Sequence, residues 1–357
     1  MRTDELDYPL PLDAVATTPA SPREHARLMV VSRSDASVQP IHARIADLPD
    51  FLRPHDLLIF NASRVLPARF KGRNLRTGGA VEGLYLRAPS SDTWEVMLKA
   101  RRLRENALIE LDDSAGAPSG VRFVLLHQAA GDEPGSWLVR VEGPPDALER
   151  VGLTPLPPYI LAARRRAHLD IADADDRRWY QTAFAADAGS VAAPTAGLHF
   201  THELLARLSA RAVEHAHVLL HVGTGTFRPV ETETIEAHPM HAEWCSMPEA
   251  LAERIRARTG RVISVGTTSA RTVESYFALD PALPWPEHLS TRLLITPGYT
   301  WRALDGLLTN FHLPRSTLMA MVAAMLPGGV EHLKALYAEA IARGYRFYSY
   351  GDAMLIL

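Results

Sequence analysis

Histidines and small loop residues are concentrated in one part of this chain. Seven of the 15 histidines lie between His199 and His241, beside the stretches GSVAAPTAGLHFT (Gly189–Thr201) and HVGTGTFRPV (His221–Val230). An imidazole titrates near neutral pH and can therefore exchange protons with a ligand. Small residues let the backbone approach a bulky ligand closely. The clustering is the first indication of a functional site.

Two of the glycine- and hydroxyl-rich loops directly follow apolar strands. HVGTGTFRPV follows one such strand, and in SVGTTSARTVES (Ser264–Ser275) the run from Gly266 to Ser269 separates a strand from a helix. A helix start of this kind exposes backbone N–H groups and can hold a carboxylate or phosphate. The alternative is that a hydroxyl of Thr267, Thr268 or Ser269 only caps the helix. Neither loop is a Walker or dinucleotide motif, which favours a small ligand with a carboxylate and hydroxyls.

Two further groups are weaker candidates. His238, His241, Glu243 and Cys245 are close in sequence, as in metal sites, but Pro239 indicates a loop and no second cluster supplies more ligands, so we expect no metal. A pocket-lining role suits His241 better. Asn310 and His312 precede a helix and could orient a heterocycle, unless His312 is simply buried. No G-x-S-x-G elbow for a serine hydrolase is present.

The elements that must position these residues predict two structural units. Short alternating segments, including 81–88, 94–100, 107–112, 121–127 and 136–143, are separated by turn residues and predict a small all-β barrel or sandwich. Strands and helices alternate outside this region, as in α/β proteins. We therefore expect an α/β domain formed by residues 1–70 and 153–357, with an all-β barrel-like domain inserted at residues 71–152.

Composition and charge restrict the class of protein. The net charge is −3, so a nucleic acid would have to meet a local basic patch. Such patches are Lys99, Arg101, Arg102 and Arg104 on the β unit and the run from Arg164 to Arg166, which are otherwise solvated surface. Arg64 and Arg69 follow a buried strand and could serve the pocket or the domain junction. One cysteine excludes a disulfide framework, and the absence of a signal peptide or long apolar run predicts a cytoplasmic protein without membrane contact.

Several motifs occur in a characteristic order. They are NASRVLPAR, TGGAVE, YQTAFA, GSVAAPTAGLHFT, HVGTGTFRPV, HPMHAE, VGTTSARTVES, TNFHLPRST and YRFYSYGDAMLI. With these motifs the chain resembles the S-adenosylmethionine:tRNA ribosyltransferase-isomerase family of queuosine biosynthesis over practically its whole length. The resemblance implies an α/β domain with an inserted β-barrel, in agreement with the pattern of elements.

The resemblance also implies a reaction. Family members take S-adenosylmethionine as co-substrate and a tRNA with 7-aminomethyl-7-deazaguanine at the wobble position. They transfer the ribosyl part to the aminomethyl nitrogen and isomerise it to an epoxycyclopentane, which gives epoxyqueuosine tRNA and releases adenine and methionine. The sulfonium acidifies the neighbouring ribose carbon, so a modest base can remove its proton. No metal and no obligate protein partner are expected.

The site residues follow from placing this reaction on the motifs. His199 would project from a pocket wall as general base or acid, with His221, Arg228, His241 and His312 as further catalytic candidates. The expected S-adenosylmethionine-binding residues share the small loops: Pro194, Thr195, Ala196, Gly197, Gly223, Thr224, Gly225, Thr226, Gly266, Thr267, Thr268 and Asn310. The expected RNA contacts are Arg64, Arg69, Lys99, Arg101, Arg102 and Arg164.

Departures from the family pattern concern the acceptor more than the co-substrate. Ala62, Ser63, Thr224, Thr296 and Trp301 differ from the commoner family residues. One alternative is therefore a paralogue with the same ribosyl chemistry on a non-tRNA acceptor. Two others are a non-catalytic RNA-binding module and a metal-assisted hydrolase.

Overall fold

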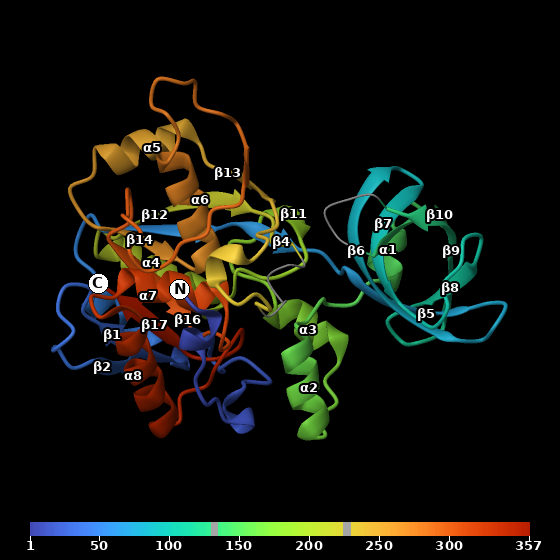
Figure 1. Ribbon diagram of the computed structural model, residues 1–357, viewed down its shortest axis with the longest axis horizontal. Helices are drawn as coiled ribbons and strands as arrows, with labels where there is room; N and C mark the ends of the chain where they lie inside the picture. Colours follow the sequence, from blue (N-terminus) through green and yellow to red (C-terminus); the bar gives the residue numbers. More distant parts are fainter. Residues whose placement is uncertain (130–134, 224–229) are drawn as a thin grey trace.

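A computed structural model describes residues 1–129, 135–223 and 230–357. It contains a large unit with a mixed sheet and a smaller closed barrel, joined by a narrow connection (Figure 1). The predicted fold class, an α/β unit with an inserted all-β barrel, is confirmed. In the described ranges no helix is long and apolar enough to cross a bilayer.

The large unit is built on a nine-stranded sheet in the order β15-β13-β12-β3-β14-β16-β17-β1-β2. The inner strands β12, β3, β14 and β16 run parallel to one another, so their carboxyl ends share one edge. β17 is antiparallel to β16 and parallel to β1. The strands span β1 Arg27–Val31, β2 Ile41–Arg44, β3 Leu57–Asn61, β12 Glu214–Leu220, β13 Glu243–Ser246, β14 Val262–Val265, β15 Leu289–Thr291, β16 Gly306–Asn310 and β17 Ala353–Ile356.

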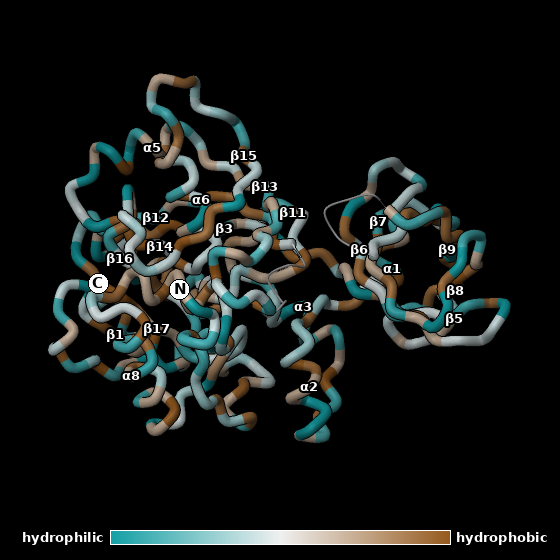
Figure 2. The backbone as a smooth tube through the Cα atoms, viewed as in Figure 1, coloured by the Kyte–Doolittle hydropathy of each residue, from teal (hydrophilic) through white to brown (hydrophobic). Residues whose placement is uncertain are grey.

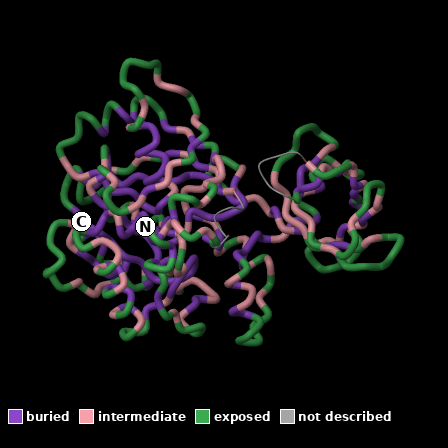
Figure 3. The backbone as a smooth tube through the Cα atoms, viewed as in Figure 1, coloured by how far each residue is buried: buried purple, intermediate pink, exposed green. Residues whose placement is uncertain are grey.

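Both faces of the sheet are covered, which explains why the central strand β3 is buried along its whole length. All five residues of β3 are buried: Leu57 and Ile59 pack in one hydrophobic cluster, Leu58 and Phe60 in another. This alternation follows from the two-residue period of a strand. Apolar and buried residues accordingly concentrate along the central strands, with polar, exposed residues in the outer loops (Figures 2 and 3).

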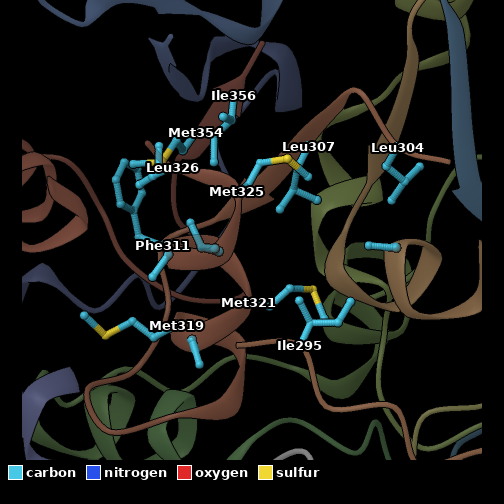
Figure 4. Packing of buried hydrophobic residues seen from close by; sticks show 14 of the residues in the cluster. Ile295, Leu304, Leu307, Phe311, Met319, Met321, Met325, Leu326, Met354 and Ile356 are labelled. Atoms are coloured by element: carbon cyan, nitrogen blue, oxygen red, sulfur yellow. The ribbon is translucent and has the colours of Figure 1, made fainter. Parts of the chain in front are cut away.

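Helices of the C-terminal half fill the larger cluster. Residues of α5, α6, α7 and α8 belong to it, and α4 belongs to the cluster on the opposite face. Methionines of α7 pack there: Met325 lies beside Leu307 of β16, and Met321 lies beside Ile295 (Figure 4). The helices span α4 His202–Ala210, α5 Glu249–Arg256, α6 Thr267–Phe277, α7 Thr317–Met325 and α8 Gly329–Ala342, and the short 3₁₀ turns include η1 Thr3–Leu6, η2 Leu12–Ala14, η3 Arg23–His25, η4 Ile45–Asp50, η5 Thr195–His199 and η7 Ile235–Ala237.

The barrel closes in the order β10-β7-β6-β5-β8-β9, with every neighbouring pair antiparallel. Aromatic rings fill its core: Phe123 meets Phe70 and Trp94 edge to face, with centroids 5.2 and 5.3 Å apart. The elements span β5 Arg69–Asn74, β6 Ala80–Ser90, β7 Thr93–Lys99, β8 Leu108–Asp112, β9 Pro118–Gln128, β10 Ser136–Glu142 and α1 Ala147–Val151.

The two chain segments that enter and leave the barrel are bonded to each other. The Arg69 amide donates to the Leu153 carbonyl at 3.1 Å, and the Leu153 amide donates to the Arg69 carbonyl at 2.5 Å. A Cβ on Gly152 would lie 2.0 Å from the Pro67 carbonyl oxygen, so only glycine permits this close approach. Near the connection lie β4 Ser63–Val65, β11 Asp187–Ser190, α2 Pro158–Arg166 and α3 Asp173–Trp179 (Figure 1).

Replacing Phe123 with alanine tests the barrel as a separate core. We expect a loss of about 3–5 kcal/mol in the free energy of unfolding of the barrel, because the change removes a fully buried ring and leaves a cavity. Hydrogen exchange should show lost amide protection in β5–β10 and retained protection in β3, β12 and β14. Equal loss in both units would show that they unfold together and contradict the prediction.

Candidate functional site

The main cavity lies at the carboxyl edge of the parallel strands. Its volume is about 330 Å³, and it is lined by Val222 after β12, the α6 start after β14, and the end of β16. Open α/β sheets bind ligands at this kind of edge. Of the predicted site residues, those brought together on its wall are Pro194, Thr195, Ala196, Gly266, Thr267, Thr268, Asn310 and His312. Thr224, Gly225, Thr226 and Arg228 lie outside the described residues.

The Asn310 side chain links three segments that line this cavity. Its Oδ1 accepts a hydrogen bond from Thr195 Oγ1 at 3.1 Å. Its Nδ2 lies 3.1 Å from the Tyr348 carbonyl oxygen and 3.3 Å from His199 Nε2. A buried amide with these partners fixes the 194–197 loop against the end of β16 and the 348–352 turn.

His199 does not line the main cavity, in contrast to the expectation that it projects into it. Its side chain is buried behind Asn310 and borders a smaller hollow with Arg23 and Tyr350. Burial, followed by the charges of Arg346 and Arg23, lowers the pKa of His199 to about 3. The imidazole is therefore neutral near pH 7, and it reaches the cavity only through Asn310. The local reason is that η5 turns the chain before α4, which directs this side chain into the packed layer.

His312 is the imidazole on the wall of the main cavity. Its Nε2 lies 2.8 Å from Thr309 Oγ1, and its backbone N–H donates to the Tyr337 hydroxyl at 3.0 Å. Burial lowers the pKa of His312 to about 4, so the ring is neutral near pH 7. A neutral imidazole has one ring nitrogen that donates and one that accepts, so it can form a hydrogen bond to a ligand without placing a positive charge in the cavity.

His221 and His241 lie outside the main cavity. His221 Nδ1 is 2.9 Å from Ser63 Oγ, and its ring stacks on Trp244 at a centroid distance of 4.9 Å. A Cβ on residue 189 would approach the His221 ring to 2.7 Å, so only glycine at this position leaves room for the ring. His241 instead lines a second, smaller cavity beside Glu243.

Comparison with known proteins decides the family. A family model described as "Queuosine biosynthesis protein" matches residues 3–356. The chain belongs to this family. It is 48% identical to the S-adenosylmethionine:tRNA ribosyltransferase-isomerase of Gloeobacter violaceus, over 99% of this chain and 96% of that one. The proteins of the same description from Sphingopyxis alaskensis and Anaeromyxobacter dehalogenans are 45% and 44% identical, over all of this chain and 97% and 99% of theirs.

A solved structure of the family has the same fold. The crystal structure of the S-adenosylmethionine tRNA ribosyltransferase from Thermotoga maritima is 28% identical and superposes with a TM-score of 0.52, covering 99% of this chain and all of that one. The recognition made from the ordered motifs is therefore confirmed.

Other predicted binding residues of this family member are placed behind or beside the wall. Gly197 is buried, and a Cβ there would lie 2.8 Å from the Phe184 ring. The Gly223 amide donates to Glu243 Oε1 at 3.2 Å, which directs it toward the second cavity. Both glycines therefore shape the site from outside the main cavity rather than line it.

The basic residues of the family member divide into exposed and buried groups. Lys99, Arg101 and Arg102 are exposed on the barrel. Arg64 is exposed at a crevice of about 140 Å³, and Arg69 lies 3.9 Å from Glu82. The remaining residue, Arg164, was expected at the RNA surface but is not there.

Arg164 is committed to the protein interior. It is 5% exposed, and its guanidinium forms two hydrogen bonds to the Asp176 carboxylate, at 2.6 and 2.7 Å. Its Nε also donates to the Thr17 carbonyl at 3.0 Å. A guanidinium saturated in this way holds α2 against α3 and is not available to nucleic-acid phosphates.

Aromatic side chains on the cavity wall were missed from the sequence. Tyr159, Tyr180 and Tyr348 all line it; the rings of Tyr159 and Tyr348 lie 4.7 Å apart, and the Tyr159 hydroxyl is 2.5 Å from Ser349 Oγ. Of these three, only Tyr348 lies in the motif YRFYSYGD, where three tyrosines in six residues beside a glycine turn are an unusual feature. Within the described ranges, no group of three or more His, Cys, Asp or Glu side chains could hold a metal ion.

The two buried imidazoles predict a loss of stability in acid. Their folded-state pKa values of about 3 and 4 lie below the ordinary value of 6.5, so the unfolded chain binds more protons below pH 6.5. Stability is complete above that pH and falls as the pH drops toward the folded-state values. Between pH 7 and 5 we expect a loss of about 2 kcal/mol in the free energy of unfolding for each imidazole.

Urea titrations at pH 7 and pH 5 measure this effect. His199→Gln and His312→Gln should each reduce the difference between the two pH values, whereas the exposed His202→Gln should leave it unchanged. An unaltered pH dependence in both buried variants would contradict the prediction.

Proposed function

We propose that this chain transfers and isomerises the ribosyl moiety of S-adenosylmethionine onto 7-aminomethyl-7-deazaguanine in tRNA, giving epoxyqueuosine tRNA and releasing adenine and methionine. The observation that carries the proposal is the cavity of about 330 Å³ at the sheet edge, in a chain that matches relatives of this activity over its whole length. The cavity is of the size and mixed polarity that small-molecule sites have.

The wall of the cavity offers a distinct partner to each part of a nucleoside. Thr195 donates its hydroxyl proton to Asn310, so its oxygen lone pairs are left to accept from an amino or hydroxyl group of the ligand. The backbone at the start of α6, at Thr267 and Thr268, offers N–H donors beside a positive helix end. Tyr159 and Tyr348 supply ring faces for the base.

Two histidines take different parts in the proposed reaction. His312 lines the cavity as a neutral imidazole and is the group placed to exchange a proton with the bound ligand. His199 acts as a positioning residue, because it contacts Asn310 rather than the cavity. The sulfonium of S-adenosylmethionine acidifies the adjacent ribose carbon, which lowers the basicity that the protein must supply.

A route for the acceptor base leads from the surface crevice to the cavity. Tyr180 lines both, and Arg64 stands at the crevice, between the connection to the barrel and residues of α1 and α3. The Tyr180 hydroxyl is buried and has no hydrogen-bond partner in the part of the chain that the structure describes. We place the tRNA across this crevice, with Lys99, Arg101 and Arg102 of the barrel on the phosphates.

The deciding experiment measures adenine release. Purified protein is incubated with S-adenosylmethionine and tRNA containing 7-aminomethyl-7-deazaguanine, with guanine-containing tRNA and the free deazaguanine base as controls. Adenine release and a modified nucleoside only with the aminomethyl-deazaguanine tRNA support the proposal. Turnover with the free base alone would identify the paralogue with a non-tRNA acceptor, and no adenine in any arm would reject the ribosyl chemistry.

The basic residues of the barrel predict a salt-dependent defect in RNA binding. Arg101→Gln and Arg102→Gln should each raise the KM for tRNA, with the KM for S-adenosylmethionine unchanged. Each should also reduce the slope of log Kd against log salt by about one, because one phosphate contact is lost. Lys334→Gln on α8 is the matched control. Unchanged slopes in both barrel variants would remove the barrel from the RNA interface.

A further inference from the structure

A second cavity of about 40 Å³ lies beside the first. Its wall combines the ion pair of Arg271 and Glu243 with apolar residues of the 293–295 segment and α7. Leu318 lines both cavities. Thr267 of the main cavity and Arg271 of the second are four residues apart on α6, which places them on one face of the helix, one turn apart. The two cavities therefore lie side by side and share part of their walls.

Arg271 is a buried cation with an unused donor. It is 7% exposed; its Nη1 bonds to the Glu243 carboxylate, and its Nε donates to the Leu293 carbonyl at 3.2 Å. Its Nη2 is buried and has no hydrogen-bond partner among the residues that the structure describes. Buried guanidinium donors are almost always satisfied, so an unpaired one at a cavity wall is expected to meet a ligand acceptor.

The size and chemistry of the second cavity restrict that ligand. A volume of about 40 Å³ has room for a group as small as a carboxylate or one water molecule, not for a phosphate ester or a ring. The cationic guanidinium of Arg271, with its unpaired Nη2, matches a carboxylate of that size. Ile295 and Met321, which lie close together in Figure 4, supply apolar surface for an aliphatic stem.

We infer that the second cavity is the subsite for the α-carboxylate of S-adenosylmethionine, with Arg271 Nη2 as the donor. The inference rests on the proposed function and adds the residue that distinguishes S-adenosylmethionine from nucleosides lacking its carboxylate. The methylene stem lies along Leu318, which lines both cavities, and Glu243 is a positioning residue that holds the guanidinium. Methionine leaves from this subsite after transfer, and adenine leaves from the main cavity.

Three ligands test the subsite in the wild-type protein without any substitution. Binding is measured calorimetrically for S-adenosylmethionine, for its decarboxylated form, which keeps the sulfonium and amine, and for methylthioadenosine, which lacks the amino-acid end. We expect the decarboxylated form to bind about 10- to 100-fold more weakly than S-adenosylmethionine, because a charge-assisted bond to Arg271 is lost. Equal dissociation constants for the first two ligands would overturn the inference.

A conservative variant assigns the difference to Arg271. In Arg271→Lys the preference for S-adenosylmethionine over its decarboxylated form should shrink to less than threefold, while the affinity for the decarboxylated form stays near the wild-type value. Arg254→Lys, in the exposed ion pair with Glu214, is the matched control and should keep the full preference. A variant that weakens both ligands equally would show a purely structural role and overturn the inference; if it does not fold, the wild-type comparison decides.

Adenine release separates this inference from the proposed function. If wild-type protein releases adenine from S-adenosylmethionine and from the decarboxylated form with equal kcat/KM, the subsite is wrong and the function stands. If no adenine is released from either but the carboxylate preference in binding is present, the subsite stands and the proposed function fails.

Discussion

The common carboxyl edge of four parallel strands is the constraint on which the site depends. β12, β3, β14 and β16 end at this edge. One buried asparagine lies at the end of β3 and another at the end of β16. Asn61, at the end of β3, accepts from the Ser63 and Leu220 amides and donates to Thr268 Oγ1 at 3.2 Å. Asn310, at the end of β16, connects Thr195, His199 and the Tyr348 carbonyl. These two amides convert separate loops into one wall, because each has its hydrogen-bond capacity used by several segments.

Burial also changes what the histidines can do. The sequence shows an imidazole with a pKa near neutrality, but enclosure in an apolar layer disfavours the charged form. His199 and His312 are both neutral well below pH 7 for this reason, although only His312 reaches the cavity. The same low-dielectric surroundings strengthen the hydrogen bonds that the cavity wall can form with a ligand.

Local patterns predicted the fold well because they are set by short-range geometry. The two-residue alternation in segments such as 121–127 follows from the barrel wall, and the family motifs place Thr195, Thr267, Asn310 and His312 on one cavity. The apolar spacing of HELLARLSARAVE is typical of a helix from His202 to Glu214, but α4 ends at Ala210, because Ala212 adopts a left-handed conformation (φ 57°) before β12 begins at Glu214. The sequence has no glycine at this position that would have predicted the turn.

Pairings between distant segments could not be predicted in the same way. Arg164 belongs to a run of three arginines, which is usual for a solvated surface, yet Asp176 draws it into the interior. The position of His199 behind Asn310 depends on contacts made 111 residues apart. Arg271 lies in the middle of a helix, and only the fold shows that its guanidinium meets Glu243 and a cavity. In each case the side chain contacts a residue of another element, and the spacing of residues in the sequence does not indicate which one.

The paired crossing at Arg69 and Leu153 has a mechanical consequence for the barrel. Two chain segments bonded to each other resist rotation about their common axis more than a single segment does. The close packing of Gly152 on Pro67 restricts movement further. The paired connection therefore restricts how far the barrel can rotate relative to the large unit. A ligand that contacted both the barrel and the sheet edge would have to span a distance that this connection restricts.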